Sequence, residues 1–185
     1  MKSLYILVLI ALVSSCFVSA TEEVVDIEQD FDAFNTTENI HYYLEKFGKL
    51  PLSTCQKAAA RASHYSTCGC PYVYGGTSCG CGSGGLDCSG LVYRSYNDAG
   101  WSGIGRTTFN QIGQGGACNS KCSPSNPGAC TVGDLFFYCF AQPCPSHVVM
   151  YIGGGKAAEC PYTGLNCRII TPYATSYQTC RSMCG

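Results

Sequence analysis

Apolar positions change from helical spacing in the first half of the chain to short runs in the second half. Helical spacing is clearest before residue 100, at Leu91, Val92, Ser95, Tyr96 and Ala99. Gly100 then provides a helix stop, so the pattern predicts a helix whose first turn holds Cys88. Later apolar runs have the length of strands, at 134–140, 147–152, 156–160 and 168–172. Helices followed by strands predict an α+β fold with an antiparallel sheet packed on the Cys88 helix.

Three further segments complete the predicted organisation. Ser53–Gln56 fits a helix capping box, and the sequence CQKAAARASHY from Cys55 continues with strong helix formers. The glycine-rich stretch CPYVYGGTSCGCGSGG, residues 70–85, predicts a loop between the two helices. Residues 115–130, GGACNSKCSPSNPGAC, predict a second loop that disulfides close.

The first 20 residues have the layout of a secretory signal peptide. Lys2 precedes an apolar run over residues 4–13, and Val18–Ala20 ends in small residues, which predicts cleavage after Ala20. The apolar run is too short to span a bilayer comfortably, and no later segment is long and apolar enough. We therefore expect an exported protein without an integral membrane segment. A bacterial lipoprotein site ending in Cys16 is the alternative interpretation.

Charge separates residues 21–50 from the rest of the chain. Residues 21–50 contain eight acids and two lysines, a net charge of −6, and residues 51–185 contain four acids and eight bases, a net charge of +4. We interpret 21–50 as an acidic arm: a solvated leader, a packing extension or a propeptide that covers a basic cleft. The functional domain is then 51–185. Asn35 begins a glycosylation sequon, which has meaning only in a eukaryotic secretory route.

The chain contains 16 cysteines, and 15 remain if the signal peptide, with Cys16, is removed. Such a density in an exported chain predicts an oxidising compartment and a disulfide framework. Seven pairs would leave one thiol over. Zinc is the alternative use of cysteine clusters, but the spacings at 68–70, 79–81 and 118–122 do not form two CxxC knuckles. We therefore expect no bound metal.

Cys88 differs from the other cysteines because it starts a predicted helix. A helix N-terminus stabilises an anion, so a thiol there favours the thiolate form that acts as a nucleophile. Such a nucleophile needs a base and a group that orients the base. His147 opens a predicted strand, and Glu159 lies in the next strand, across a turn of three glycines. Two adjacent antiparallel strands would place the His147 and Glu159 side chains on one face, within hydrogen-bonding distance.

Six segments carry a resemblance to a known family. In chain order they are PYVYGGTS, LDCSGLVYRSYNDAG, GRTTFNQ, VGDLFFY, HVVMYIGGGKAAE and RIITPY, within residues 56–173. Together they resemble the NlpC/P60 family of papain-like cysteine peptidases, which act on bacterial cell-wall peptides. The resemblance implies the papain-like α+β fold, in which N-terminal helices, one of them led by the nucleophile, pack on an antiparallel sheet.

The resemblance also implies roles for individual residues. Cys88 corresponds to the nucleophile, and His147 corresponds to the general base and acid. Glu159 falls on the position that orients the histidine, where many relatives have a second histidine. Tyr72 matches a family tyrosine whose hydroxyl approaches the catalytic centre and assists the oxyanion.

Three further residues match positions near the family's substrate. Asp87 and Ser89 correspond to residues that help bind the substrate peptide, and Arg106 corresponds to an arginine that is structural or lines the cleft. The loop between Tyr72 and Cys88 is longer than usual, and the cysteines are more numerous than in most relatives. Both departures leave substrate selection by this loop open.

The function implied is that of a secreted, monomeric endopeptidase of peptidoglycan or muropeptides, with no cofactor and no nucleic acid partner. The bond implied joins γ-D-glutamyl to a diamino acid, either diaminopimelate or lysine. One alternative is an N-acetylmuramoyl-L-alanine amidase with the same triad of Cys88, His147 and Glu159. The other is a non-catalytic, disulfide-rich cell-wall-binding protein. The stem-peptide type and the disulfide connectivity stay open at this point.

Overall fold

The computed structural model describes residue 41, residues 44–45 and residues 48–184. The predicted signal peptide over 1–20, with Cys16, and the sequon at Asn35 lie outside these residues, as does most of the acidic arm. Within the described part of the chain, no helix combines the length and the apolar character that a bilayer span requires.

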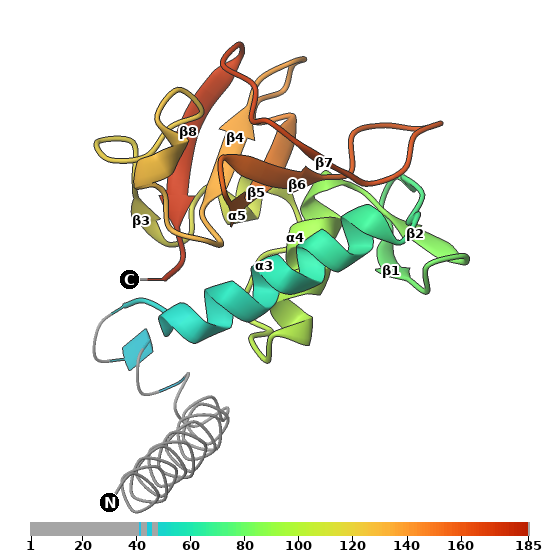
Figure 1. The fold of residues 1–185 in the computed structure, drawn as a ribbon, viewed down its shortest axis with the longest axis horizontal. Helices are drawn as coiled ribbons and strands as arrows, with labels where there is room; N and C mark the ends of the chain where they lie inside the picture. Colours follow the sequence, from blue (N-terminus) through green and yellow to red (C-terminus); the bar gives the residue numbers. More distant parts are fainter. Residues whose placement is uncertain (1–40, 42–43, 46–47, 185) are drawn as a thin grey trace, which may run out of the picture. The chain divides into compact units, whose positions relative to one another are not determined.

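Helices come first and most strands follow, as the sequence predicts (Figure 1). Two helices dominate, α3 (Leu52–Thr67) and α4 (Cys88–Asp98), and a short helix, α5 (Thr108–Gln111), follows them. A small hairpin between α3 and α4 consists of β1 (Thr77–Cys79) and β2 (Gly84–Leu86). This hairpin occupies the glycine-rich segment that the sequence predicts to be a loop.

A six-stranded sheet forms the second half of the fold. Its strands, in spatial order, are β3 (Gly116–Ala117), β8 (Tyr177–Ser182), β4 (Leu135–Tyr138), β5 (His147–Gly153), β6 (Lys156–Glu159) and β7 (Arg168–Ile170). Each neighbouring pair is antiparallel. A short 3₁₀ helix, η1 (Pro127–Ala129), lies between β3 and β4. The predicted α+β fold, with an antiparallel sheet packed on the Cys88 helix, is confirmed.

The central strands β4 and β5 are buried on both faces of the sheet. In β4, Leu135 and Phe137 join the core beneath α3 and α4, whereas Phe136 and Tyr138 join a second cluster. All four side chains are fully buried. Alternate side chains of a strand point to opposite faces, so burial of both faces explains why this segment reads as an uninterrupted apolar run.

The predicted face of the Cys88 helix is confirmed. Leu91, Val92, Ser95 and Tyr96 are all buried in α4. Gly100 has a φ of +91°, the left-handed conformation that ends many helices. The spacing of apolar residues therefore identified both the buried side and the end of this helix.

The sequence pattern misplaces the start of α3 and does not predict β8. The capping box at Ser53–Gln56 does not start α3, which begins at Leu52 with Pro51 as its N-cap and no side-chain cap. Pro51 suits this entry because its ring fixes φ near the helical value, and its carbonyl accepts the N–H of Thr54. The pattern also misses β8. Its apolar alternation is weak, since Cys180 is the one fully buried residue in the strand.

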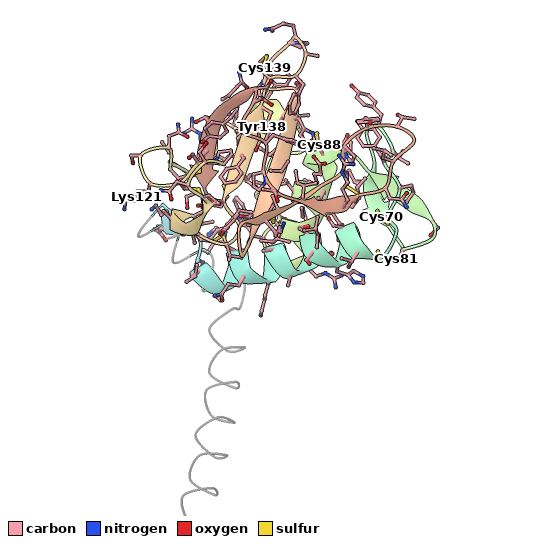
Figure 2. The ribbon with its side chains drawn as sticks, turned by 45° about the horizontal axis from the view of Figure 1, so that its top comes forward. Cys70, Cys81, Cys88, Lys121, Tyr138 and Cys139 are labelled. Atoms are coloured by element: carbon pink, nitrogen blue, oxygen red, sulfur yellow. A yellow bond between two sulfur atoms is a disulfide. The ribbon has the colours of Figure 1, made fainter. Side chains whose placement is uncertain are left out.

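Seven disulfides cross-link the domain. They join Cys55–Cys184, Cys68–Cys81, Cys70–Cys79, Cys118–Cys180, Cys122–Cys130, Cys139–Cys144 and Cys160–Cys167. Among the described residues Cys88 is the unpaired cysteine, as the count of seven pairs predicts. In Figure 2, Cys88 lies near the ends of the central strands, while Cys139 lies in the loop beyond them.

The end of the acidic arm belongs to the core. Leu50 is buried, and its N–H donates to the Met183 carbonyl at 3.0 Å. The Cys55–Cys184 disulfide fixes the start of α3 to the same C-terminal segment. A shortened form of the protein for experiments should therefore retain Leu50.

At Gly90, the loop before β1 packs closely on α4. A Cβ on Gly90 would overlap the Gly76 carbonyl oxygen. We therefore expect Gly90→Ala to destabilise the domain by about 1–3 kcal/mol, the range for overpacking, and to lower Tm in thermal unfolding. Gly128→Ala is the matched control, because no atom lies within 4 Å of its Cβ position. Equal Tm values for the two variants would contradict this close packing.

Candidate active site

Helix α4 presents Cys88 as its first residue. Asp87 is the N-cap, and its Oδ1 atom accepts the N–H of Gly90 at 2.6 Å. This cap satisfies one of the free amides of the first turn and so starts the helix at Cys88. Cys88 is 9% exposed and lines a cavity of about 550 Å³. The walls of this cavity also contain the other residues predicted near the oxyanion and the substrate: Tyr72, Asp87, Ser89 and Arg106.

An ion pair between Asp87 and Arg106 holds the start of α4. Arg106 Nη2 donates to Asp87 Oδ2 at 2.9 Å, and Nη1 donates to Oδ1 at 3.0 Å. Arg106 also donates to the Ser89 hydroxyl and to the Gly76 carbonyl, each at 3.0 Å. Asp87 Oδ2 accepts the Gly75 N–H at 2.8 Å. The three residues form one network that ties the loop to the helix, and their contact with substrate stays a prediction.

Gln111 is a positioning residue that sequence reasoning missed. Its side chain is fully buried, and Nε2 donates to the carbonyls of Ser89 and Gly105 at 2.9 and 2.8 Å. In the same short helix, the Thr108 hydroxyl donates to the Pro145 carbonyl at 2.8 Å. Helix α5 therefore connects the first turn of α4 with the loop before β5. The sequence feature that could have drawn attention to Gln111 is its position in GRTTFNQ, one of the segments that resemble the family.

His147 and Glu159 meet across two neighbouring strands. His147 is the first residue of β5 and Glu159 is the last residue of β6. Nε2 of His147 and Oε2 of Glu159 are 2.8 Å apart, and both side chains are buried. The hydrogen bond that the sequence pattern predicts from two adjacent antiparallel strands is therefore present.

The second oxygen of Glu159 has two donors of its own. Arg168 Nε donates to Oε1 at 2.8 Å, and the Tyr173 hydroxyl donates to the same atom at 2.7 Å. A buried carboxylate is stable only when it is paired and hydrogen-bonded, so Arg168 and Tyr173 belong to the site. Sequence reasoning missed both. The register of the two strands could have revealed Arg168, since it lies directly opposite Glu159 in the β6–β7 pair.

The environment of His147 favours its protonated form. Burial opposes the charge, but the interactions of the ring with nearby Cys88 and with Glu159, its hydrogen-bond partner, outweigh burial and raise the pKa of His147 from 6.5 to about 9. Burial also acts against the charge of Glu159, yet its bonds to His147 and Tyr173 lower the pKa of Glu159 below the ordinary value. Since Nε2 of His147 bonds Glu159, Nδ1 is the nitrogen left for Cys88. The arrangement supplies Cys88 with a charged imidazolium, the partner that a thiolate needs.

Tyr72 lines the Cys88 cavity from the loop before β1. Its N–H donates to the Leu165 carbonyl at 2.9 Å, and its backbone pairs with Leu86, which fixes the residue in place. Burial, together with nearby Cys88 and Asp87, raises the pKa of Tyr72 to about 12. The hydroxyl therefore keeps its proton at neutral pH and can donate it in a hydrogen bond to an oxyanion.

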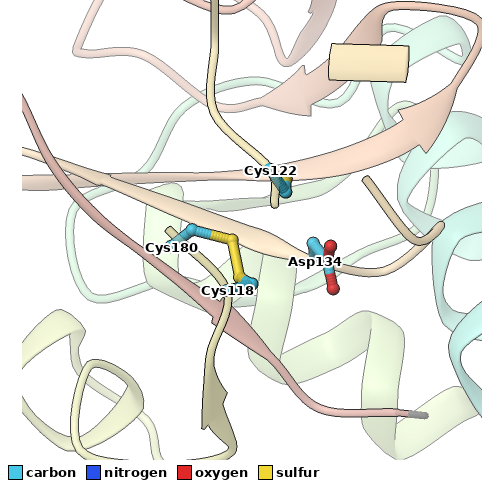
Figure 3. Close-up of side chains that lie close together, drawn as sticks. All are labelled: Cys118, Cys122, Asp134 and Cys180. Carbon is cyan, nitrogen blue, oxygen red and sulfur yellow. A yellow bond between two sulfur atoms is a disulfide. The ribbon is translucent and has the colours of Figure 1, made fainter. Parts of the chain in front are cut away.

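Two cysteine clusters have the composition of metal sites, but their sulfur atoms form disulfides. The first cluster contains Cys118, Cys122, Asp134 and Cys180 (Figure 3). Two of its sulfur atoms are bonded to each other, and the third is bonded to Cys130. The second cluster is His64 beside the Cys68–Cys81 disulfide. Zinc binds cysteine as the thiolate, and the oxidised protein offers none at these positions.

Replacing Glu159 tests the electrostatic arrangement. Glu159→Gln removes a charge that raises the pKa of His147, so the imidazolium is lost at a lower pH. We expect kcat/KM for the peptide cleavage that the family resemblance implies to fall about tenfold or more, as for a lost charge-assisted hydrogen bond of about 1.5–3 kcal/mol. The alkaline limb of the pH profile, near pH 9 in the wild type, should move to lower pH.

Asp98→Asn is the matched control for this variant. Asp98 is a carboxylate at the opposite end of α4, held by Tyr65, Arg61 and Arg94. Its replacement should leave the alkaline limb where it is in the wild type. An unmoved limb in Glu159→Gln, or the same shift in Asp98→Asn, would contradict the coupling of Glu159 to His147.

Comparisons with known proteins agree with one another. The sequence model of the NlpC/P60 family matches residues 69–183. Gamma-D-glutamyl-L-lysine dipeptidyl-peptidase of Bacillus subtilis is 34% identical over 112 residues, which cover 60% of this chain and 34% of that protein. Peptidoglycan endopeptidase RipA of Mycolicibacterium smegmatis is 28% identical over 162 residues, covering 72% of this chain and 31% of RipA. The chain thus spans about a third of the length of these curated relatives.

Solved structures show the same relation. An NlpC/P60 family protein from Bacillus cereus matches with a TM-score of 0.56 at 25% identity, over 71% of this chain and 40% of that chain. The segment matched by the family's sequence model contains Cys88, His147 and Glu159, together with α4 and the whole six-stranded sheet. By sequence and by fold, the chain belongs to the NlpC/P60 family.

Proposed function

We propose that this chain is a secreted cysteine endopeptidase that hydrolyses peptidoglycan stem peptides. The observation that carries the proposal is the unpaired Cys88 thiol, which lines a cleft and interacts electrostatically with His147 of the buried His147–Glu159 pair. The proposal includes a signal peptide over 1–20, an acidic arm or propeptide over 21–50 and a peptidase domain over 51–185. The seven disulfides support an oxidising, extracellular location.

Cys88 acts as the nucleophile in the first step. Its thiolate adds to the carbonyl carbon of the scissile amide, and the carbonyl oxygen becomes an oxyanion. Backbone N–H groups at the start of α4 and the protonated Tyr72 hydroxyl serve as donors for this oxyanion. His147, charged at neutral pH, gives its proton to the amine nitrogen as the C–N bond breaks. The products of this step are a thioester on Cys88 and a free amine.

Water releases the acyl group in the second step. Neutral His147 takes a proton from water while the water oxygen adds to the thioester carbonyl, and the C–S bond then breaks. The carboxylic acid product leaves, and the thiolate of Cys88 again lies beside the imidazolium of His147. Glu159 orients the imidazole ring and stabilises its charge in both steps. The two steps use protein groups and water alone.

The proposed scissile bond joins γ-D-glutamyl to a diamino acid, either diaminopimelate or lysine. Support comes from two relatives, a γ-D-glutamyl-L-lysine dipeptidyl-peptidase and a peptidoglycan endopeptidase. We propose that Asp87, Ser89 and Arg106 contact the peptide on the acyl side of this bond, because they line the Cys88 cavity.

The geometry favours catalysis over wall binding alone. A binding protein has no use for a free thiol beside a buried, charged imidazole, whereas a nucleophile requires both. An amidase that cuts between muramic acid and L-alanine would use the same three residues. The two enzymes differ in the fragments that they release.

Digestion of purified peptidoglycan tests the proposal. The wild-type protein should release fragments with a new N-terminal diamino acid, identified by mass spectrometry. Cys88→Ala should lower the rate about 10³-fold or more, because the described domain has no second free thiol to form the thioester. Release of intact stem peptides that begin with L-alanine would instead identify the amidase.

Ser95→Ala is the matched control in the same helix. Its hydroxyl is buried without a hydrogen-bond partner among the described residues, and it lies outside the Cys88 cavity. This variant should digest peptidoglycan at the wild-type rate. Undiminished digestion by Cys88→Ala would show that another group performs the chemistry, and the proposed function would then be wrong.

A further inference from the structure

A second cavity borders His147. Its volume is about 450 Å³, and its lining includes Phe140, His147, Glu159, Tyr162, Arg168 and Tyr173. Two of its walls come from loops closed by disulfides, Cys139–Cys144 and Cys160–Cys167. Ser146 lines both this cavity and the Cys88 cavity, so the two are neighbours.

The residues that line each cavity fit the two halves of a cleaved peptide. Cys88 and Tyr72 line the first cavity, whereas His147 lines the second. The attacked carbonyl must lie at Cys88, and the departing amine must lie at His147, which gives it a proton. The acyl half of a substrate therefore belongs in the first cavity, and the amine half belongs in the second.

Arg168 offers positive charge to a ligand in the second cavity. Its side chain is 46% exposed, and its partners among the described residues are Glu159, through Nε, and Tyr173, through Nη2. A guanidinium has further N–H donors, which stay open to a carboxylate. Glu159 is the acidic residue in the lining, and it is fully buried with both oxygens engaged. A ligand ammonium therefore finds no open anion there.

Aromatic rings form another part of the wall. Phe140 and Tyr162 are large side chains that stay exposed. Exposed apolar groups gathered at a cavity are typical of a binding surface. Phe140 stacks on the ring of Tyr138 with centroids 5.4 Å apart, which limits its orientation. The rings suit a hydrocarbon chain, and Arg168 suits a carboxylate at the end of that chain.

We propose that this cavity is the leaving-group subsite and that it selects diaminopimelate over lysine. The inference rests on the proposed function. In an internal cleavage the α-carboxyl of the leaving diamino acid is tied up in the next amide bond, so the side-chain carboxylate is the one available to Arg168. Diaminopimelate carries that carboxylate and lysine lacks it. The methylene chain, common to both, lies against Phe140 and Tyr162.

Synthetic tetrapeptides of the form L-Ala-γ-D-Glu-X-D-Ala test the subsite. X is diaminopimelate, diaminopimelate amidated at its side-chain carboxyl, or lysine. The wild-type protein should cleave the first peptide with kcat/KM about tenfold or more above the other two, as expected for one charge-assisted hydrogen bond. Arg168→Gln should remove this preference. Because Arg168 also supports Glu159, all rates should fall in the variant, and the ratio between peptides is therefore the readout.

Two further variants separate the contributions. Arg61→Gln is the matched control, because Arg61 is 47% exposed and paired with Asp98, outside both cavities. It should keep the wild-type ratio. Tyr162→Ala should lower kcat/KM for all three peptides by a similar factor, because the hydrocarbon wall serves each of them.

The outcomes separate this inference from the function on which it rests. Equal cleavage of the three peptides by the wild type, or a preference that Arg168→Gln retains, would overturn the subsite assignment and leave the proposed function standing. Failure of the wild type to cleave any of the three would overturn the proposed function and the subsite with it.

Discussion

The buried carboxylate of Glu159 is the constraint on which the candidate active site depends. A charge removed from water costs several kcal/mol unless it is paired and hydrogen-bonded, and the Glu159 side chain is 0% exposed. Its partners come from β5, from β7 and from the segment after β7, namely His147, Arg168 and Tyr173. The antiparallel register of three strands brings these groups together. The sheet therefore sets the position and the charge of the His147 imidazole, and helix α4 places the Cys88 thiol beside it.

Cys88 is subject to the opposite constraint. Seven disulfides use fourteen cysteines of the described chain, yet the proposed mechanism requires Cys88 to stay reduced beside them. Its place at a capped helix start, with a charged imidazolium as neighbour, gives it a partner other than sulfur. The disulfides also contribute to function in this account, because the loops that Cys139–Cys144 and Cys160–Cys167 close are walls of the second cavity.

Local periodicity was enough to predict α4 and the bond between His147 and Glu159. Both depend on side chains that are close in sequence or on two strands joined by a short turn. The ion pair of Asp87 with Arg106 and the burial of Gln111 depend on how separate segments pack, which periodicity does not contain. The proximity of Arg168 to Glu159 could have been predicted from the sequence, since the two residues lie opposite each other once the strands are paired. Strand β8 was missed because most of its residues are only partly buried, so it lacks a clear apolar alternation.

Alkylation of the unreduced protein with iodoacetamide, followed by peptide mapping, is the most direct test of the central claim that one activated thiol works with the His147–Glu159 pair. We expect a single fast label on Cys88, formed much more slowly in His147→Ala because the imidazolium that supports the thiolate is gone. Labels spread over several cysteines, no label on Cys88, or an unchanged rate in His147→Ala would contradict it.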